Sequence, residues 1–389
     1  MTHSPADFVK TAYRTARHFG FMPLDAIPRP PRTQEQLVVQ KAATADRQLD
    51  ALHGALTSGT STYFEQALHD GKPALFFSIF ETPRTEGIAL NLQIIGVKKS
   101  IAEALLIQTL RSLLRDLGYP HQSVRINSLG DHDSVTRYLR ELGAYLKKRQ
   151  EDMPPHTREL MKENIMEAFL HLAEQGHELC VKSPNPLEYL SDASRRHFRE
   201  IIEHLDMTGT PYEIDPRLVG HQHCYADTLF TIELRDKNDR PISEPPLVVR
   251  GGRLDAFVTH IIKTDVPAVG AVVMRSGKKI PARHVAALRR ADIPSVFMVQ
   301  LGFAPKIRCL MLLDTLKAAD ISVHQALVSD SLSEQLRQAE AYNVPFSLIL
   351  GQKEFVENSI IVRDMRSRSQ QNIPFDTLIP HLKRLLSRI

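Results

Sequence analysis

Apolar residues recur at helical spacing in two segments of the first 120 residues. One segment spans residues 6–19, and in the other a leucine stripe runs over residues 106–117. Ser100 and Glu103 precede this stripe with the spacing of a capping box, and Gly118 follows it. The pattern predicts two amphipathic helices, the second beginning after Ser100 and ending at Gly118.

Polar–apolar alternation, which is typical of strands in antiparallel sheets, occurs at residues 123–128 and returns beyond residue 210. Between them, residues 131–206 have helical patterns, with Ser191 as the expected N-cap of the last helix. Past about residue 290, strand and helix patterns alternate to the end of the chain, which is typical of a small α/β domain. We therefore expect an α+β core over residues 1–289, with a helical insertion at 131–206, and a second domain over residues 290–389.

Composition and charge narrow the class of protein. Hydrophobic residues make up 42% and charged residues 24% of the 389 positions, as in ordinary globular proteins. Three cysteines without a CxxC pair argue against a disulfide scaffold or a zinc ribbon. Neither a signal peptide nor a membrane-spanning stretch is evident, so a cytoplasmic protein without a membrane partner is expected. The net charge of +4 permits a polyanionic partner, although 6% aromatic residues and no Trp disfavour a base-stacking platform.

The order of several segments resembles one family. "VRINSLGD", "YLSDASRRHFREIIEHLDMTGTPYEIDPRLV", "RGGRLDAF" and "VPAVG" follow one another as in the class II histidyl-tRNA synthetase family. The stretch "LKAADISVHQALVSDSLSEQLRQAEAYNVPFSLILGQKEF" resembles the anticodon-binding domain of that family. The similarity is specific from about residue 75 onward. It implies a class II synthetase-like core, an antiparallel sheet with helices, followed by an anticodon-binding-like α/β domain.

The resemblance also implies a reaction, in which a carboxylate attacks the α-phosphate of ATP. Fixed arginines stabilise the charge that develops on the phosphate oxygens. Three such arginines of the family are replaced here, by Ile79 in "SIFETP", by Gly220 after "PRLV" and by Gly277 in "VPAVGAVVMRSGKK", whereas Glu81 is kept. We therefore expect no catalytic residue and no bound cofactor.

The residues that the resemblance assigns to the amino-acid pocket are altered in the same way. Ser58 stands at the position of an acidic residue of the family, and Thr60, two residues later, is retained. A glutamine and a glutamate of the family correspond to Ile94 and Lys98. Lys98 would repel the ammonium group that it should neutralise. Cys224 and Tyr225 stand where the family has two paired tyrosines. Gly251, Gly252 and Arg253, by contrast, resemble the family's sheet segment beneath the bound amino acid. The expectation is a vestigial pocket.

A metal site is the alternative interpretation of His221, His223 and Cys224. These side chains are of the types that bind zinc. Because neighbouring strand residues point to opposite faces, His223 and Cys224 cannot easily share one ion. We therefore expect a strand that lines the pocket, with no metal.

Three functions fit the resemblance. The favoured one is a pseudoenzyme that forms a homodimer through residues 6–24 and binds tRNA or structured RNA. A divergent active histidine–tRNA ligase, using ATP and Mg²⁺, is the alternative. A regulatory or interaction subunit, like the synthetase-like partner in histidine biosynthesis, is less favoured, because that partner lacks the second domain. The residues expected to contact RNA phosphates are Arg363, Arg366, Arg368, Lys383 and Arg384.

Overall fold

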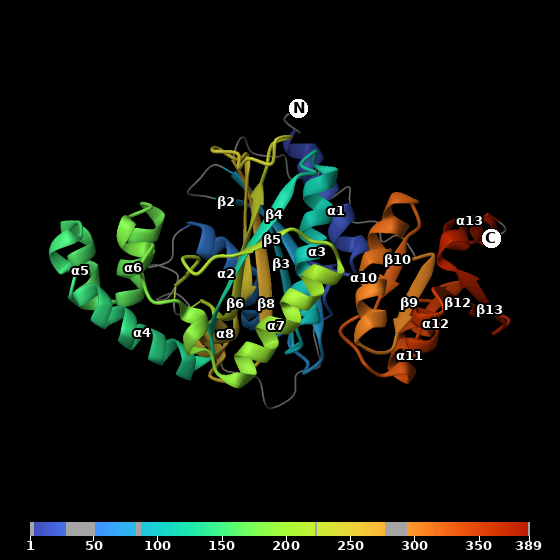
Figure 1. The fold of residues 1–389 in the computed structure, drawn as a ribbon. Coiled ribbons are helices and arrows are strands. Elements are labelled where there is room, and N and C mark those ends of the chain that lie inside the picture. The colour runs from blue at the N-terminus through green and yellow to red at the C-terminus, as the bar shows by residue number, and fades with distance from the viewer. Residues whose placement is uncertain (1–3, 29–50, 83–86, 222–223, 277–293, 388–389) are drawn as a thin grey trace.

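The computed structural model describes residues 4–28, 51–82, 87–221, 224–276 and 294–387. Within these ranges the chain forms an eight-stranded sheet and, beyond residue 294, a five-stranded sheet (Figure 1). The predicted domain boundary between residues 289 and 290 lies outside the described residues. No helix in the described ranges is long and apolar enough to cross a membrane.

The larger sheet has the strand order β1-β2-β3-β8-β7-β6-β4-β5. Its neighbours are antiparallel except for the pairs β1–β2 and β4–β5, so the sheet is mixed rather than purely antiparallel. Its strands are β1 (Met22–Pro23), β2 (Ala74–Thr82), β3 (Gly87–Ile95), β4 (Gln122–Gly130), β5 (Tyr212–Ile214), β6 (Ala226–Leu234), β7 (Leu247–Arg253) and β8 (Ala268–Ser276).

Alternate residues of the strands point to opposite faces of this sheet. On the back face, Leu90 and Leu92 of β3 pack in one buried cluster with α1, α3 and α7. On the front face, Ala89 and Ile95 pack in a second cluster with α2 and α8. These helices are α1 (Pro5–His18), α2 (Ala51–Glu65), α3 (Ile101–Asp116), α7 (Asp192–Met207) and α8 (Asp255–Ile262).

The apolar side of α1 is already buried within this chain. Phe8, Val9 and Ala12 are at most 1% exposed, and the residues of α1 that face solvent include Asp7 and Lys10. The predicted homodimer therefore cannot use that apolar side without rearrangement.

The helical insertion contains α4 (His132–Lys147), α5 (Pro155–Glu163) and α6 (Ile165–Glu174). The predicted cap of α7 is confirmed, because the Ser191 hydroxyl accepts a hydrogen bond from the Ser194 backbone N–H. The predicted capping box of α3 is wrong. Ser100 has a helical backbone and donates its hydroxyl to Glu200, while Glu103 is buried against Arg253.

The smaller sheet has the order β10-β9-β11-β12-β13, with the first three strands parallel. Alternation of strands and helices predicted this domain, although not α12 or β13. Its elements are β9 (Val296–Gln300), α10 (Phe303–Ala318), β10 (Val323–Gln325), α11 (Leu332–Ala341), β11 (Phe346–Leu350), α12 (Gln352–Val356), β12 (Ser359–Asp364), β13 (Gln370–Pro374) and α13 (Phe375–Leu386).

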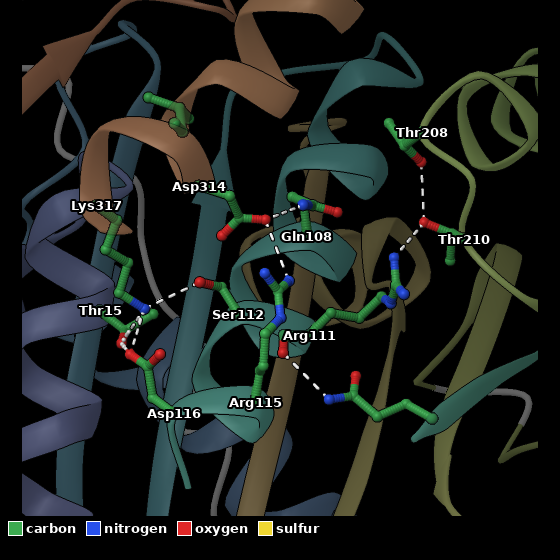
Figure 2. Close-up of polar contacts among 12 residues, drawn as sticks. Thr15, Gln108, Arg111, Ser112, Arg115, Asp116, Thr208, Thr210, Asp314 and Lys317 are labelled. Atoms are coloured by element: carbon green, nitrogen blue, oxygen red, sulfur yellow. Dashed lines mark hydrogen bonds and ion pairs between the residues drawn. The ribbon is translucent and has the colours of Figure 1, made fainter. Parts of the chain in front are cut away.

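Helix α10 joins the two sheets by packing against α1 and α3 of the core. Buried leucines of α10 belong to the same hydrophobic cluster as the back face of the larger sheet. Polar contacts surround this junction (Figure 2): Lys317 Nζ lies 2.9 Å from both Thr15 Oγ1 and Ser112 Oγ, and 2.5 Å from Asp116 Oδ2. Asp314 accepts hydrogen bonds from Gln108 and Arg115. The junction is therefore both apolar and ionic.

Candidate functional site

Two glycines lie side by side on the front face, in the middle of the larger sheet. Gly252 of β7 pairs with Gly270 of β8, and Gly270 pairs with Gln93 of β3. A Cβ atom on Gly252 would lie 2.8 Å from the Tyr225 ring, and one on Gly270 would overlap the Gln93 amide. The side chains of Tyr225 and Gln93 therefore fill the space above the glycines.

Helix α2 closes the front face beside these glycines. A Cβ atom on Gly59 would overlap the Asn91 side chain, so the helix backbone lies directly on β3. Asn91 Nδ2 donates to the Leu56 carbonyl over 2.6 Å, and Gln93 Nε2 donates to the same oxygen over 2.8 Å. Asn91 and Gln93 are completely buried. These amides bind the helix to the centre of the sheet.

Ser58 and Thr60 lie within α2, whereas the resemblance placed them in a substrate loop. The Ser58 hydroxyl donates to the Ala55 carbonyl of the same helix, over 2.9 Å. Thr60 is completely buried in the same helix. Neither residue lies in a loop that could close over a substrate.

The stretch after "PRLV" packs against α2 and the helical insertion. His221 Nδ1 lies 2.5 Å from Glu167 Oε1 of α6, and the His221 ring meets the His53 ring edge-on at 4.3 Å. Cys224 and Tyr225 are at most 2% exposed. This stretch packs against the closed front face rather than forming the wall of an open pocket. It is also not the predicted strand, because His221, Cys224 and Tyr225 precede β6, which begins at Ala226, and the Cys224 N–H donates to the His221 carbonyl over 2.9 Å.

Gly220 has no room for a longer side chain. A Cβ atom at this position would overlap the Tyr225 ring. An arginine at residue 220 would therefore require Tyr225 to move away from its place above Gly252.

Three residues assigned to the pocket lie on the back face instead. Ile94 is completely buried in the cluster that contains α1 and α3, and Ile79 packs against the same cluster. Glu81 is two residues beyond Ile79 on β2, so its side chain points to the same back face, and it is exposed. The polar residue of β3 that does face front is Gln93. A shift of one residue reverses the face of every side chain in a strand, which explains this error.

Of the predicted Gly-Gly-Arg segment, only Gly252 faces the front. A Cβ atom on Gly251 would lie 2.8 Å from Ala271 Cβ, which belongs to the back cluster. The Arg253 side chain also points to the back, where its Nε donates to Glu103 Oε1 over 2.8 Å. Neither of these two residues lines the pocket.

Glu103 lies at the centre of a buried ionic group on the back face. Its Oε1 atom also lies 2.8 Å from His197 Nε2. Burial alone would raise the pKa of Glu103, but the charges of Arg253 and His197 lower it to about 2. Burial alone would lower the pKa of His197, but its hydrogen bond to Glu103 raises it. This group fastens α3 and α7 to the end of β7.

Of the remaining candidate residues, only Lys98 lies within the described ranges. Lys98 is exposed in the turn before α3. Gly277 and His223 lie outside the described residues. Across the described ranges, no group of three or more His, Cys, Asp or Glu side chains is arranged to hold a metal ion.

Sequence reasoning missed four residues of the closed front face: His53, Asn91, Gln93 and Glu167. For two of them a signal existed, because Asn91 and Gln93 are the polar positions of period two within the apolar run "IALNLQII". No local signal indicated that His53 and Glu167 would meet His221, because both contacts connect segments far apart in the chain.

The residues predicted to contact RNA lie at the end of the second domain. Arg363 is half-buried on β12, and Arg366 and Arg368 are exposed in the turn that leads to β13. Lys383 and Arg384 are exposed in the last turn of α13, which packs against β12 and β13 at the end away from the core (Figure 1). The structure thus brings the five basic residues to neighbouring elements.

Sequence and fold comparisons find relatives over most of the chain. Residues 298–385 match the family described as "Anticodon binding domain". The histidine–tRNA ligase of Cyanothece sp. is 26% identical over 300 residues, covering 77% of this chain and 68% of the relative. That of Bacillus velezensis is 27% identical over 315 residues, covering 78% and 72%. The solved structure of apo S. aureus histidyl-tRNA synthetase matches with 19% identity and a TM-score of 0.42, covering 81% of this chain and 77% of that one.

Proposed function

This chain is a distant member of the class II histidyl-tRNA synthetase family, and from that premise we propose that it is a catalytically degenerate synthetase-like protein that binds tRNA or a tRNA-like RNA. It keeps the two parts of that fold, a mixed-sheet core and an α/β anticodon-binding domain. Under this proposal the core no longer activates an amino acid, and the second domain supplies the contacts to RNA.

The observation that carries the loss of activity is the filled front face. Amino-acid activation needs space above the sheet for both an amino acid and ATP. Here the space above Gly252 and Gly270 is occupied by Tyr225 and Gln93, and α2 lies directly on β3. A fixed arginine cannot simply be restored at residue 220, because the Tyr225 ring occupies the position of its Cβ atom. Removing one such transition-state contact typically costs about 3 kcal/mol or more.

RNA binding is supported by the basic residues at the end of the second domain. Arg366 and Arg368 are exposed in a turn, where they can reach phosphates without disturbing the sheet. Each phosphate neutralised by a basic side chain contributes about one unit to the salt dependence of binding. The domain type supports this assignment, since it is the anticodon-binding one.

Two measurements test the proposal. Histidine-dependent exchange of labelled pyrophosphate into ATP should not rise above a control without histidine; exchange above that control would instead establish the active ligase. Filter binding of bulk tRNA over a salt series should weaken when Arg366→Glu and Arg368→Glu are combined, and its salt slope should fall by about two.

A matched pair of substitutions controls for net charge. Lys237→Glu with Arg240→Glu changes the charge equally on an exposed turn of the core. If both double variants weaken tRNA binding to the same extent, the effect comes from overall charge and the RNA site lies elsewhere.

A further inference from the structure

The turn that joins β12 to β13 carries arginines and serines in alternation at its tip. In the sequence "RDMRSRSQQ", which begins at Arg363, Arg366 precedes Ser367 and Arg368 precedes Ser369, and these four residues are exposed. The only acidic residue in this stretch is an aspartate at position 364, against three arginines. The turn therefore presents an excess of positive charge beside two hydroxyls that solvent can reach.

The backbone of the turn holds the two hydroxyls together. Ser367 Oγ and Ser369 Oγ lie 2.9 Å apart, and the Ser369 N–H donates to Ser367 Oγ over 3.3 Å. Between them, Arg368 has a left-handed backbone with φ of 61°. Asp364 Oδ1 accepts hydrogen bonds from the backbone N–H groups of Arg366 and Ser367, over 2.8 and 2.7 Å. The carboxylate thus holds the turn from within, and the guanidinium groups remain in excess at the tip.

Strand β13 lies at the edge of the smaller sheet, so the turn beside it can open locally (Figure 1). Within the described part of the chain it pairs only with β12, over five residue pairs. Four of its five residues are exposed. An enzyme that modifies a serine binds the surrounding peptide in an extended form, and opening an edge strand needs much less free energy than unfolding the whole domain. The serines are therefore accessible to such an enzyme.

The charges that precede Ser369 distinguish it from Ser367. Arg368 immediately precedes Ser369, and Arg366 stands three positions before it. Guanidinium groups at these positions suit a kinase whose substrate groove is acidic, because they pair with its carboxylates. Three positions before Ser367 stands Asp364, which such a groove would repel. The expected acceptor of a phosphoryl group is therefore Ser369.

We propose that Ser369 is the phosphorylation site of a serine/threonine kinase, and that its phosphate releases RNA from the second domain. In this step Ser369 Oγ forms a bond to the γ-phosphorus of ATP as the bond from that phosphorus to the β–γ bridging oxygen breaks. ADP leaves, and the hydroxyl proton passes to the catalytic aspartate of the kinase. The release of RNA rests on the RNA-binding function proposed above, whereas the phosphorylation itself does not.

A phosphate on Ser369 would reverse the charge of the turn. Phosphoserine carries about −1.5 to −2 charges at pH 7, enough to offset Arg366 and Arg368. Both guanidinium groups would pair with this phosphate and would no longer be available to the phosphates of RNA. The binding of tRNA should therefore weaken by about tenfold or more, and its salt slope should fall by about two.

Labelling with ATP tests the site itself. The unmodified full-length protein is incubated with purified cyclic-AMP-dependent protein kinase, which prefers arginines before its serine, and mass spectrometry should then locate phosphate on Ser369. Ser367 and Ser333 should stay unmodified. Ser333 is the matched control, because it is exposed on α11 and has Asp330 three positions before it. No phosphate on Ser369, or as much on Ser333, would overturn the proposal.

Phosphorus NMR without RNA tests the pairing within the turn. Phosphoserine inserted during translation at residue 369 has a second pKa of about 6 in the absence of partners. The guanidinium groups of Arg366 and Arg368 should lower this pKa, and Arg366→Gln combined with Arg368→Gln should bring it back. The same pKa in both proteins would show that these arginines do not pair with the phosphate.

Filter binding of bulk tRNA tests the effect on RNA. Ser369→phosphoserine should weaken binding by about tenfold or more, whereas Ser333→phosphoserine adds the same charge on α11, beside β9, and should not. Equal weakening by both would assign the effect to overall charge and refute the switch. If Arg366→Glu combined with Arg368→Glu weakens binding but Ser369→phosphoserine does not, RNA binding stands and the switch is wrong. If neither weakens binding, the RNA site proposed for the second domain fails as well.

Discussion

Lys317 should be a principal polar contact that holds the second domain against the core. Its ammonium group lies between α1 and α3 and contacts Thr15, Ser112 and Asp116 (Figure 2). The side chain is 15% exposed. Lys317→Met keeps most of the aliphatic stem and removes the charge together with all three polar contacts, so the variant isolates the polar contribution.

The expected loss of stability follows from these contacts. A hydrogen bond that involves a charged group contributes about 1.5–3 kcal/mol. Asp116 is 41% exposed, so solvent screens its attraction to Lys317 and the ion pair adds little more. Thr15 and Ser112 are at most 2% exposed, so their hydroxyls would lose a donor that water cannot easily replace. We therefore expect the free energy of unfolding to fall by about 2 kcal/mol.

Urea unfolding followed by far-ultraviolet circular dichroism measures this loss. The chain has no Trp, so backbone ellipticity is the more suitable signal. If the dependence of the unfolding free energy on urea concentration is unchanged, the urea concentration at the midpoint falls in proportion to the lost free energy. If the junction couples the two sheets, the variant should also separate one transition into two, because the domain released from the core would unfold first.

Lys353→Met is the matched control. Its side chain is 77% exposed and its ammonium group lies 3.9 Å from Glu357, within the second domain. Its effect should stay within about 0.5 kcal/mol, as for other exposed pairs. If Lys317→Met and Lys353→Met have the same effect, the contacts of Lys317 do not hold the junction and the reasoning is refuted.

The other predictions concern pH, the vestigial pocket and assembly. Burial lowers the pKa of His18 to about 4, against an ordinary 6.5, so the free energy of unfolding should fall by up to about 3 kcal/mol as pH falls from about 6.5 to 4. His18→Gln should make the free energy of unfolding less dependent on pH over this range. An unchanged pH dependence in the variant would contradict the role given to His18. Gly220→Arg should not restore histidine-dependent pyrophosphate exchange and should lower the unfolding temperature through its clash with Tyr225; activity in this variant would refute the account of the closed face. Light scattering at micromolar concentration should give the mass of a homodimer, whose interface is expected to bury more than about 2,000 Å². The mass of a monomer would refute the predicted dimer.

Sequence periodicity by itself determined where most elements lie. The apolar stripes of α1 and α3, the alternation of β6 to β8 and the change of rhythm in the second domain all matched observed elements. These patterns are informative because each element must bury one side, and the repeat of its own residues sets which side. The cap at Ser191 was also predictable, because its hydroxyl and the backbone N–H of Ser194 are only three residues apart in the chain.

Only the tertiary structure decided which residues of each strand face the front of the sheet and which face the back, and which partner each polar residue has. Ile94 and Gln93 are neighbours in sequence, yet Ile94 packs with α1 and α3 on the back face, whereas Gln93 donates a hydrogen bond to α2 on the front face. Glu103 had the spacing of a cap but pairs with Arg253, 150 residues away. A strand's own pattern is compatible with either face until its neighbours fix the register, and a charged side chain takes whichever opposite charge the fold brings within reach.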